Sequence, residues 1–442
     1  MSKFDAIYGQ TIECDCGKTH HIDPQRVIYA PDALARLPRV LSEYTTGRRA
    51  ILLMDRRTRE VAGREAGALL RDADWEIAEM VVPDPAAGAS PVCDDLTHDW
   101  LLDQIAQIAA ADVVLPVGSG VINDLGKWIA FDLNLPYVCF GTAASMNGYA
   151  SANVAATING LKTLQRGRPA RAVLSDPAVL RDAPYEMTAS GLGDALAKSV
   201  SSADWRMNHF LFGDYFCERS VSLIADIEPL YMEHPEDLKA GKPDAMEALF
   251  NGLLLTGVAM TMAETSAPAS GGEHLISHTL DMMSSLDGEK HDLHGRQVGI
   301  GTILASEIYR RVLDLESPHF SYAPMDIDQA FWGALSTEVA SQYAQKSERL
   351  HQTVAILSHG DAWDRLRQAV TPYLRSPAQL CDCLARAGAA FRAEHIGCSR
   401  ERLLCAVRHA HEIRSRFTIL DLAYLVGVLP GAIEEIVDEW AS

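Results

Sequence analysis

Basic residues are scarce in this chain of 442 residues. Its 39 Lys and Arg residues stand against 59 Asp and Glu residues, so the formal net charge at pH 7 is −20. No segment of the chain is a run of Lys and Arg. A surface of this charge repels phosphate backbones, so we expect no nucleic acid as a partner. A small anion can still enter a pocket that is locally basic or that holds a metal ion.

Long apolar runs and a disulfide pattern are missing as well. The first ten residues, MSKFDAIYGQ, lack the apolar core of a secretory signal. No window reaches about 18 uninterrupted apolar residues, so we expect no membrane span. The most apolar stretch, 418–437, is interrupted by charges and by Pro430, and it predicts two helices joined by a turn. The nine cysteines are odd in number and scattered, which does not fit a disulfide framework and favours a cytoplasmic location.

The patterns that are present predict two domains of different class. Over residues 1–180, short apolar runs such as AILLMD, DVVLPV and PYVCF alternate with segments of helical spacing. This alternation predicts an α/β domain with a parallel sheet that is covered on both faces. Over residues 181–442 the apolar residues recur with helical periodicity, which predicts an all-helical domain.

A glycine-rich turn follows the strand-like run DVVLPV. Gly118, Ser119 and Gly120 lie between this run and a predicted helix. Glycines at such a turn let the backbone approach a pyrophosphate, and the helix N-terminus offers N–H groups to the anion. An ordinary strand-to-helix turn has the same pattern, and the third glycine of the usual dinucleotide motif is missing.

Two other strand ends carry polar residues. Asp55 ends the run AILLMD, where a carboxylate can bind a ribose diol and repel a 2′-phosphate. The same position suits a helix N-cap, and the sequence leaves both alternatives open. Thr142 and Ser145 follow the run PYVCF, at the end of a parallel strand where ligands bind.

Metal-binding residue types occur in the helical half. Asp194 lies in GLGD, His274 and His278 are four residues apart in GGEHLISH, and His294 begins HGRQVG. One Asp and two His from different helices can hold a divalent metal and leave positions open for a substrate.

A second cysteine and histidine cluster lies near the start of the chain. Cys14, Cys16, His20 and His21 in CDCGKTHH resemble half of a zinc site. The single-residue gap is tighter than in the usual zinc knuckle, and no second half follows nearby. We therefore predict a β-hairpin turn here. Another CDC segment, at residues 381–383, has no histidine nearby and predicts core cysteines.

Taken in order, the motifs GSG with a following Asp, TAAS, GDALAK, GGEHLISH and HGRQVG resemble the superfamily of iron-containing alcohol dehydrogenases and dehydroquinate synthases. Within it the chain is most similar to the sn-glycerol-1-phosphate dehydrogenases, including their AraM-type bacterial members. The resemblance implies a nucleotide-binding N-terminal domain, a helical metal-binding domain of the dehydroquinate synthase type and an active site between them. A homodimer is typical of these proteins.

The resemblance also assigns roles to residues. It implies NAD or NADP as the cofactor, with Asp55 at the adenosine ribose. The cofactor residues that it implies along the pyrophosphate and the nicotinamide half are Gly118, Ser119, Gly120, Val121, Ile122, Asn123, Asp124, Thr142, Ser145 and Ser151.

The implied ligands of one divalent ion, which is zinc, nickel or iron, are Asp194, His274 and His294. His278 is expected to relay a proton to and from the substrate. Asn147 stands where the relatives commonly carry an Asp near the substrate hydroxyls, and Arg296 adds a cation beside a metal motif. Both departures make the pocket less negative, so we expect a small anionic alcohol or carbonyl compound as the substrate.

The expected function is a metal-dependent, NAD(P)-linked oxidoreductase that interconverts a small phosphorylated or phosphonate-bearing alcohol and its carbonyl compound. The first pair to test is sn-glycerol 1-phosphate and dihydroxyacetone phosphate. The alternatives are a lyase similar to dehydroquinate synthase that uses NAD transiently and a non-catalytic relative.

Overall fold

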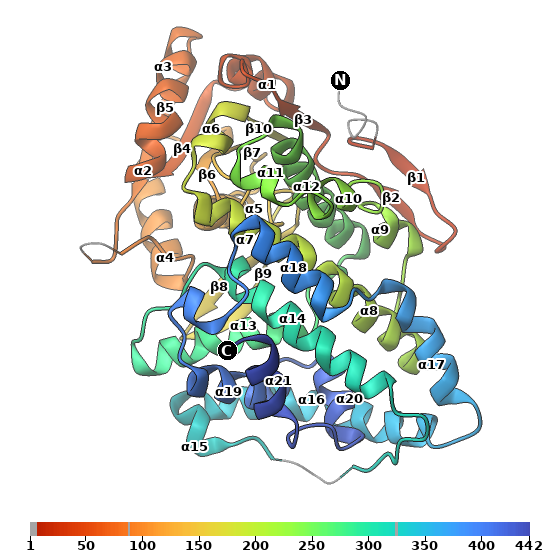
Figure 1. Cartoon of the computed structure of the whole chain (residues 1–442). Coiled ribbons are helices and arrows are strands. Elements are labelled where there is room, and N and C mark those ends of the chain that lie inside the picture. Colours follow the sequence, from red (N-terminus) through yellow and green to blue (C-terminus); the bar gives the residue numbers. More distant parts are fainter. Residues whose placement is uncertain (1–6, 87–88, 323–325) are drawn as a thin grey trace. The chain divides into compact units, whose positions relative to one another are not determined.

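The computed structural model describes residues 7–86, 89–322 and 326–442. Its internal contacts divide the chain into two compact units. The first unit comprises Met1–Gly191 and Arg219–Ser266, and the second comprises Leu192–Glu218 and Ala267–Ser442. The elements of both units are labelled in Figure 1.

A parallel sheet of six strands forms the centre of the first unit. Its order is β3-β10-β7-β6-β4-β5, and every neighbouring pair is parallel. The strands are β3 (Arg26–Tyr29), β4 (Arg49–Asp55), β5 (Glu76–Val82), β6 (Val113–Gly118), β7 (Val138–Gly141) and β10 (Ala172–Ser175). The predicted parallel sheet is confirmed, and β3 is a strand that the sequence patterns did not indicate.

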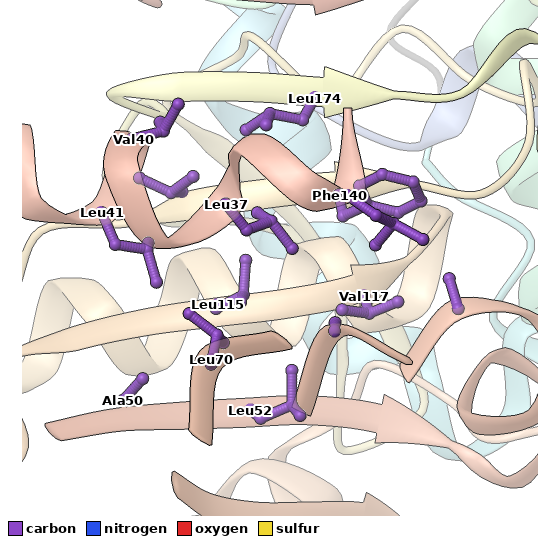
Figure 2. Close-up of a cluster of buried hydrophobic side chains, with 14 of the residues drawn as sticks. Leu37, Val40, Leu41, Ala50, Leu52, Leu70, Leu115, Val117, Phe140 and Leu174 are labelled. Carbon is purple, nitrogen blue, oxygen red and sulfur yellow. The ribbon is translucent and has the colours of Figure 1, made fainter. Parts of the chain in front are cut away.

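Helices pack on this sheet and bury its apolar runs. The helices of this part of the chain are α1 (Leu37–Tyr44), α2 (Arg56–Thr58), α3 (Arg64–Asp72), α4 (Asp95–Ile105), α5 (Gly120–Asp132) and α6 (Pro177–Asp182). Figure 2 shows Leu37 of α1 and Leu70 of α3 against Leu52, Leu115 and Phe140 of three strands. All six residues of β6 are buried, as expected for a strand covered on both faces.

Two short hairpins complete the β structure of the described residues. β1 (Thr11–Glu13) pairs with β2 (Thr19–His21), which confirms the turn predicted at CDCGKTHH. β8 (Asn153–Ile158) pairs with β9 (Leu161–Arg166), and this second hairpin was not predicted.

The boundary between the units differs from the predicted one at residue 180. Residues 219–266 pack within the first unit, although they belong to the helical part of the sequence. This insertion carries α12 (Pro243–Ala263), which contacts α6 and α10 (Glu228–Met232). α12 is long and apolar enough to cross a membrane by length and composition, but 89% of its apolar window is buried within the structure. Because this helix is apolar on all sides, it requires a surrounding core, and periodicity alone does not show which core that is.

All regular elements of the second unit's described residues are helices, as predicted. The longest are α8 (Lys198–Phe212), α13 (Gly272–Asp287), α14 (His294–Leu313) and α16 (Ser336–Leu357). Shorter ones are α15 (Gln329–Trp332), α17 (Ala362–Val370), α18 (Pro377–Ala387), α19 (Arg400–His409), α20 (Ile419–Leu425) and α21 (Ile433–Trp440). The predicted pair of helices over 418–437 corresponds to α20 and α21. The chain enters this unit through α7 (Tyr185–Leu196), and α9 (Glu218–Ser222) and α11 (Glu236–Lys239) are the remaining α-helices.

Candidate active site

The strand order creates a point where ligands bind in α/β sheets. β4 is followed along the chain by β5 on one side, whereas β6 lies on the other side of β4. Connections therefore leave in opposite directions at the carboxyl ends of β4 and β6, and a crevice at such a reversal is the usual ligand site. Asp55 ends β4 and Gly118 ends β6, so two of the predicted cofactor residues lie at this point.

The two glycines of the turn after β6 have different surroundings. A Cβ atom on Gly118 would lie 2.6 Å from Cβ of Ile122, so internal packing requires a glycine there. At Gly120 the nearest atom to an added Cβ is Cγ of Met146, at 3.9 Å. Packing therefore does not require a glycine at position 120. Since α5 begins at this residue, its first-turn N–H groups have no acceptors within the helix and can hold an anion.

After Gly120, the side chains of two predicted cofactor residues form contacts within the first unit. Asn123 accepts a hydrogen bond from the hydroxyl of Tyr137. Asp124 pairs with Nζ of Lys127 at 2.8 Å and accepts from the backbone N–H of Ala155 at 3.0 Å. Val121 and Ile122 are apolar, so this stretch can meet a pyrophosphate only through its backbone.

Lys127 is a structural residue that the motifs did not indicate. It is fully buried, and its Nζ donates to the carbonyls of Gly148 at 2.9 Å and Asn153 at 2.6 Å. These bonds attach α5 to the loop that follows β7. A lone lysine inside a helix gives no sequence signal for such a role.

The loop after β7 brings its predicted hydroxyls next to the glycine-rich turn. The N–H of Thr142 donates to the carbonyl of Gly118 at 3.2 Å. The Oγ atoms of Ser145 and Ser119 lie 2.9 Å apart. Ser151 lies further along the loop, where its Oγ accepts from the N–H of Asn153. Thr142 and Ser145 thus lie beside the turn, and their contact with a cofactor stays a prediction.

Asp55 forms the helix cap that the sequence left as an alternative. Its Oδ1 accepts from the N–H of Thr58 at 2.7 Å, and the Thr58 hydroxyl accepts from the N–H of Asp55. Its Oδ2 lies 3.2 Å from the guanidinium of Arg57, which also pairs with Asp84 at 2.8 Å. A cap does not exclude ribose binding, because each carboxylate oxygen accepts more than one hydrogen bond.

The second unit brings Asp194, His274 and His294 together. These residues come from α7, α13 and α14, and one ligand atom of each lies within 4.8 Å of the others. Nε2 of His274 is 3.5 Å from Oδ1 of Asp194, and both side chains are buried. Two imidazole nitrogens and one carboxylate oxygen suit zinc, nickel and iron alike. The donor set therefore fits the single divalent ion that the sequence predicted.

Neighbouring polar groups orient both imidazoles. Nδ1 of His274 lies 2.7 Å from Oε1 of Glu273, which leaves Nε2 to face Asp194. Nδ1 of His294 lies 3.4 Å from the hydroxyl of Ser277. Such partners fix the tautomer and the ring orientation of metal-binding histidines. Burial disfavours the charged ring of His274, but its hydrogen bonds to Asp194 and Glu273 outweigh this effect and raise its pKa to about 9.

Close packing of helices makes this convergence possible. A Cβ atom on Gly193 would lie 2.0 Å from the carbonyl oxygen of Gly295, so only a glycine fits beside the first turn of α14. Gly193 precedes Asp194 and Gly295 follows His294, so the contact sets the distance between two ligands. The motif GD thus carries a packing requirement as well as a ligand.

His278 lies next to the ligand set without belonging to it. Its ring centroid is 5.9 Å from that of His274 and 5.7 Å from that of His294, and it is nearly parallel to the latter ring. This position within the second unit is the one expected for a residue near a metal ion. Asn147 belongs to the first unit, in the loop after β7, and its part in the reaction stays a prediction.

Arg296 is already engaged within the second unit. Its Nε lies 3.1 Å from Oδ2 of Asp292, and its guanidinium donates to the carbonyl of His395. The positive charge that the sequence suggested for substrate binding is therefore partly neutralised by Asp292.

A buried acid that the motifs did not indicate supports the start of α13. Asp204 of α8 accepts hydrogen bonds from the N–H groups of Gly272 and Ile419 and from the hydroxyl of Tyr309. Burial, reinforced by the nearby charge of Glu273, raises the pKa of Asp204 to about 8. A single Asp within a helix gives no sequence signal for this role.

Comparison with known proteins agrees with this geometry. Residues 28–184 match the family model of the iron-containing alcohol dehydrogenases. The chain is 30% identical over 286 residues to a glycerol-1-phosphate dehydrogenase [NAD(P)+] of Thermococcus kodakarensis, covering 65% of this chain and 78% of the relative. The chain belongs to the iron-containing alcohol dehydrogenase family. A second relative with the same name, from Bacillus velezensis, is 29% identical over 377 residues and covers 84% of each chain.

Solved structures of this family share the fold of the chain. Glycerol dehydrogenase of Schizosaccharomyces pombe has a TM-score of 0.62 at 16% identity, and it covers 97% of this chain and 94% of its own. A 1,3-propanediol oxidoreductase has a TM-score of 0.59 at 16% identity, covering 95% of this chain and all of its own. The predicted resemblance to glycerol-1-phosphate dehydrogenases and the predicted fold class are both confirmed.

Proposed function

We propose that this family member interconverts sn-glycerol 1-phosphate and dihydroxyacetone phosphate with NAD(H) or NADP(H). The observation that carries the proposal is the convergence of Asp194, His274 and His294 in a chain whose relatives are glycerol-1-phosphate dehydrogenases. Three protein ligands that leave a coordination position open for a substrate are typical of a catalytic metal site rather than of a structural one.

The metal site supplies the polarising group of this reaction. Asp194, His274 and His294 would hold one divalent ion, which would supply Lewis-acid stabilisation of the charge on the substrate oxygen. Glu273 and Ser277 keep the two imidazoles in the orientation that binding requires. The metal itself is zinc, nickel or iron, because these ligands accept all three and availability selects among them.

The first unit binds the dinucleotide. The N–H groups at the start of α5 hold the pyrophosphate, and Gly120 lets it approach the backbone. Asp55 accepts from the adenosine ribose, while Thr142, Ser145 and Ser151 border the nicotinamide half. The bound cofactor would supply the hydride chemistry, and the residues of this chain contribute position and electrostatics.

His278 moves the proton of the substrate hydroxyl. It adjoins the ligand set without being a ligand, and an imidazole can both accept and donate a proton. Asn147 binds a substrate hydroxyl through its amide. Because Asn carries no charge where relatives commonly have an Asp, this substitution favours an anionic substrate over a neutral polyol.

A matched pair of histidine variants tests the proposal. The wild-type chain, loaded in turn with zinc, nickel or iron, is expected to oxidise NADH or NADPH with dihydroxyacetone phosphate. His294→Ala is expected to lose one equivalent of bound metal, compared with wild type, together with the activity. His291→Ala, three residues earlier and half-exposed, is the control and should keep both.

Three outcomes would contradict the proposal. A metal content equal to that of wild type, together with normal turnover, in His294→Ala would exclude the ligand assignment. Equal efficiency on glycerol and on its phosphate would show that the substrate class is wrong. A redox-neutral conversion that leaves NADH unchanged would instead support a lyase similar to dehydroquinate synthase.

The proposal also includes the cell compartment and the oligomeric state of the enzyme. We place it in the cytoplasm, because the nine scattered cysteines suit a reducing compartment. We also propose a homo-oligomer, as the family resemblance implies. Light scattering of the purified chain and fractionation of its host cells test these two points.

A further inference from the structure

The hairpin near the start of the chain brings three metal-binding side chains together. Ligand atoms of Cys14, Cys16 and His20 all lie within 4.8 Å of one another. Nε2 of His20 is 3.2 Å from Sγ of Cys16, and the imidazole is buried, with 3% of the residue exposed. Both cysteines are partly buried. All three residues belong to the first unit, whereas the Asp194 site belongs to the second.

The backbone of the hairpin produces this arrangement. The N–H of Gly17 donates to the carbonyl of Cys14 at 2.9 Å, and the N–H of Cys14 donates to the carbonyl of Lys18 at 3.1 Å. Gly17 has a φ of 85°, a left-handed conformation that favours glycine. The two cysteines therefore occupy the first and third positions of a tight turn. His20 follows on β2, opposite Ile12 of β1.

We propose that Cys14, Cys16 and His20 bind a structural zinc ion. Two thiolates and an imidazole form a soft donor set that selects zinc over the harder cations. Zinc lies about 2.3 Å from sulfur and about 2.0–2.1 Å from nitrogen, which places neighbouring ligands of a tetrahedron roughly 3.4–3.8 Å apart. The separation of 3.2 Å between Nε2 of His20 and Sγ of Cys16 is slightly shorter than this range, and all the ligand atoms lie within 4.8 Å of one another. A fourth ligand, water or another side chain, completes the tetrahedron.

A hydrogen bond between Cys16 and His20 explains less of the arrangement of the three side chains than a bound zinc ion does. A bond between the Cys16 thiol and His20 does not require a second thiol within the same 4.8 Å. The nearby cation Lys18 pairs with Glu264 at 2.8 Å, so its charge is compensated rather than directed at the thiols.

A metal ion at this site would also stabilise the fold, because a two-stranded hairpin with strands of three residues is marginally stable by itself. Metal binding contributes directly to the folding free energy of such a segment.

The single-residue gap between the cysteines is too tight for the usual zinc knuckle, but the left-handed turn at Gly17 points both cysteines to the same side as His20. The chain is therefore inferred to hold two ions of different chemistry, one with sulfur ligands and one without.

Cobalt substitution of the metal-free full-length chain tests the site independently of activity. Thiolate-bound Co²⁺ has an intense near-ultraviolet charge-transfer band, and the donor set of Asp194, His274 and His294 contains no sulfur to produce one. We expect the band in wild type and in His274→Ala, and its loss in Cys14→Ser and Cys16→Ser. The matched control is Cys381→Ser in the other CDC segment, which should keep the band.

A second measurement follows the reactivity of the two thiols and the zinc content. In the zinc-loaded wild type, Cys14 and Cys16 should resist alkylation, and removal of zinc with a chelator should make both react. Zinc content should fall by one equivalent in Cys14→Ser, while the reductase activity of the protein reconstituted at its second site is unchanged. No charge-transfer band in wild type, or alkylation of Cys14 and Cys16 at the same rate with and without zinc, would overturn the proposal.

Discussion

Nδ1 of His274 lies 2.7 Å from Oε1 of Glu273, the residue that precedes it in α13. Adjacent residues of a helix do not normally face each other, but here the carboxylate also accepts from the N–H of Gly271 at 2.7 Å. Glu273 thus folds back over the start of α13 and holds the imidazole with Nε2 toward Asp194.

Glu273→Ala should weaken metal binding without removing a ligand. Loss of a partner of this kind typically lowers metal affinity about 10- to 100-fold, because the imidazole loses its fixed tautomer and orientation. Competition with a coloured chelator measures the change. Glu273→Gln keeps an acceptor oxygen for Nδ1 and should lose much less affinity. Equal losses in both variants would mean that the carboxylate acts through its charge and not by orienting His274.

The two glycines after β6 should respond differently to alanine. Gly118→Ala places a methyl group against Ile122 and should destabilise the fold by about 1–3 kcal/mol. Gly120→Ala meets no close neighbour, so it should leave the melting temperature nearly unchanged and weaken NADH binding at least about tenfold. Calorimetric titration with NADH and thermal melts separate these effects. If Gly120→Ala binds NADH with the affinity of wild type, the pyrophosphate does not bind at the start of α5.

Asp55 combines a structural contact with the proposed choice of cofactor. Asp55→Ala removes the N-cap and should cost about 1 kcal/mol of stability. Asp55→Asn keeps an oxygen that accepts from Thr58, so it should remain close to wild type in stability. Because both variants lack the carboxylate that repels a 2′-phosphate, both should narrow the preference for NADH over NADPH. If kcat/KM favours NADPH already in wild type, the cap is the whole role of Asp55.

The buried Asp204 predicts a pH dependence of stability. Its pKa is about 8 in the folded protein and about 3.9 in an unfolded chain, so the folded state holds a proton that the unfolded state has lost between these values. The free energy of unfolding should therefore fall as pH rises from about 4 to about 8, by at most about 1.4 kcal/mol per pH unit from this group.

Asp204→Asn should flatten that profile. The loss in free energy of unfolding relative to wild type should be largest near pH 5 and should shrink toward pH 8. Urea unfolding at constant metal content measures this difference. Asp361→Asn, an exposed acid of the same unit, is the control and should leave the slope unchanged. Parallel profiles for wild type and Asp204→Asn would show that Asp204 is ionised throughout this range.

Much of this protein follows from local sequence. The runs AILLMD, DVVLPV and PYVCF are continuous and apolar because both faces of their strands are covered, so the parallel sheet is predictable from them. The ligands Asp194, His274 and His294 stand in short motifs, and a close helix contact needs Gly193 beside the first of them. Residue types and neighbours therefore suffice to find the candidate metal site.

The tertiary structure decided what depends on residues distant in sequence. Only packing shows that α12 belongs to the first unit, since its apolar surface suits any core. Likewise, Asp204 and Lys127 gain their roles from backbone groups that the fold brings to them, and no local pattern records those groups. At the first hairpin, the sequence contained the cysteines and the histidine, but the turn at Gly17 determined that their ligand atoms meet, because convergence depends on backbone direction rather than on spacing.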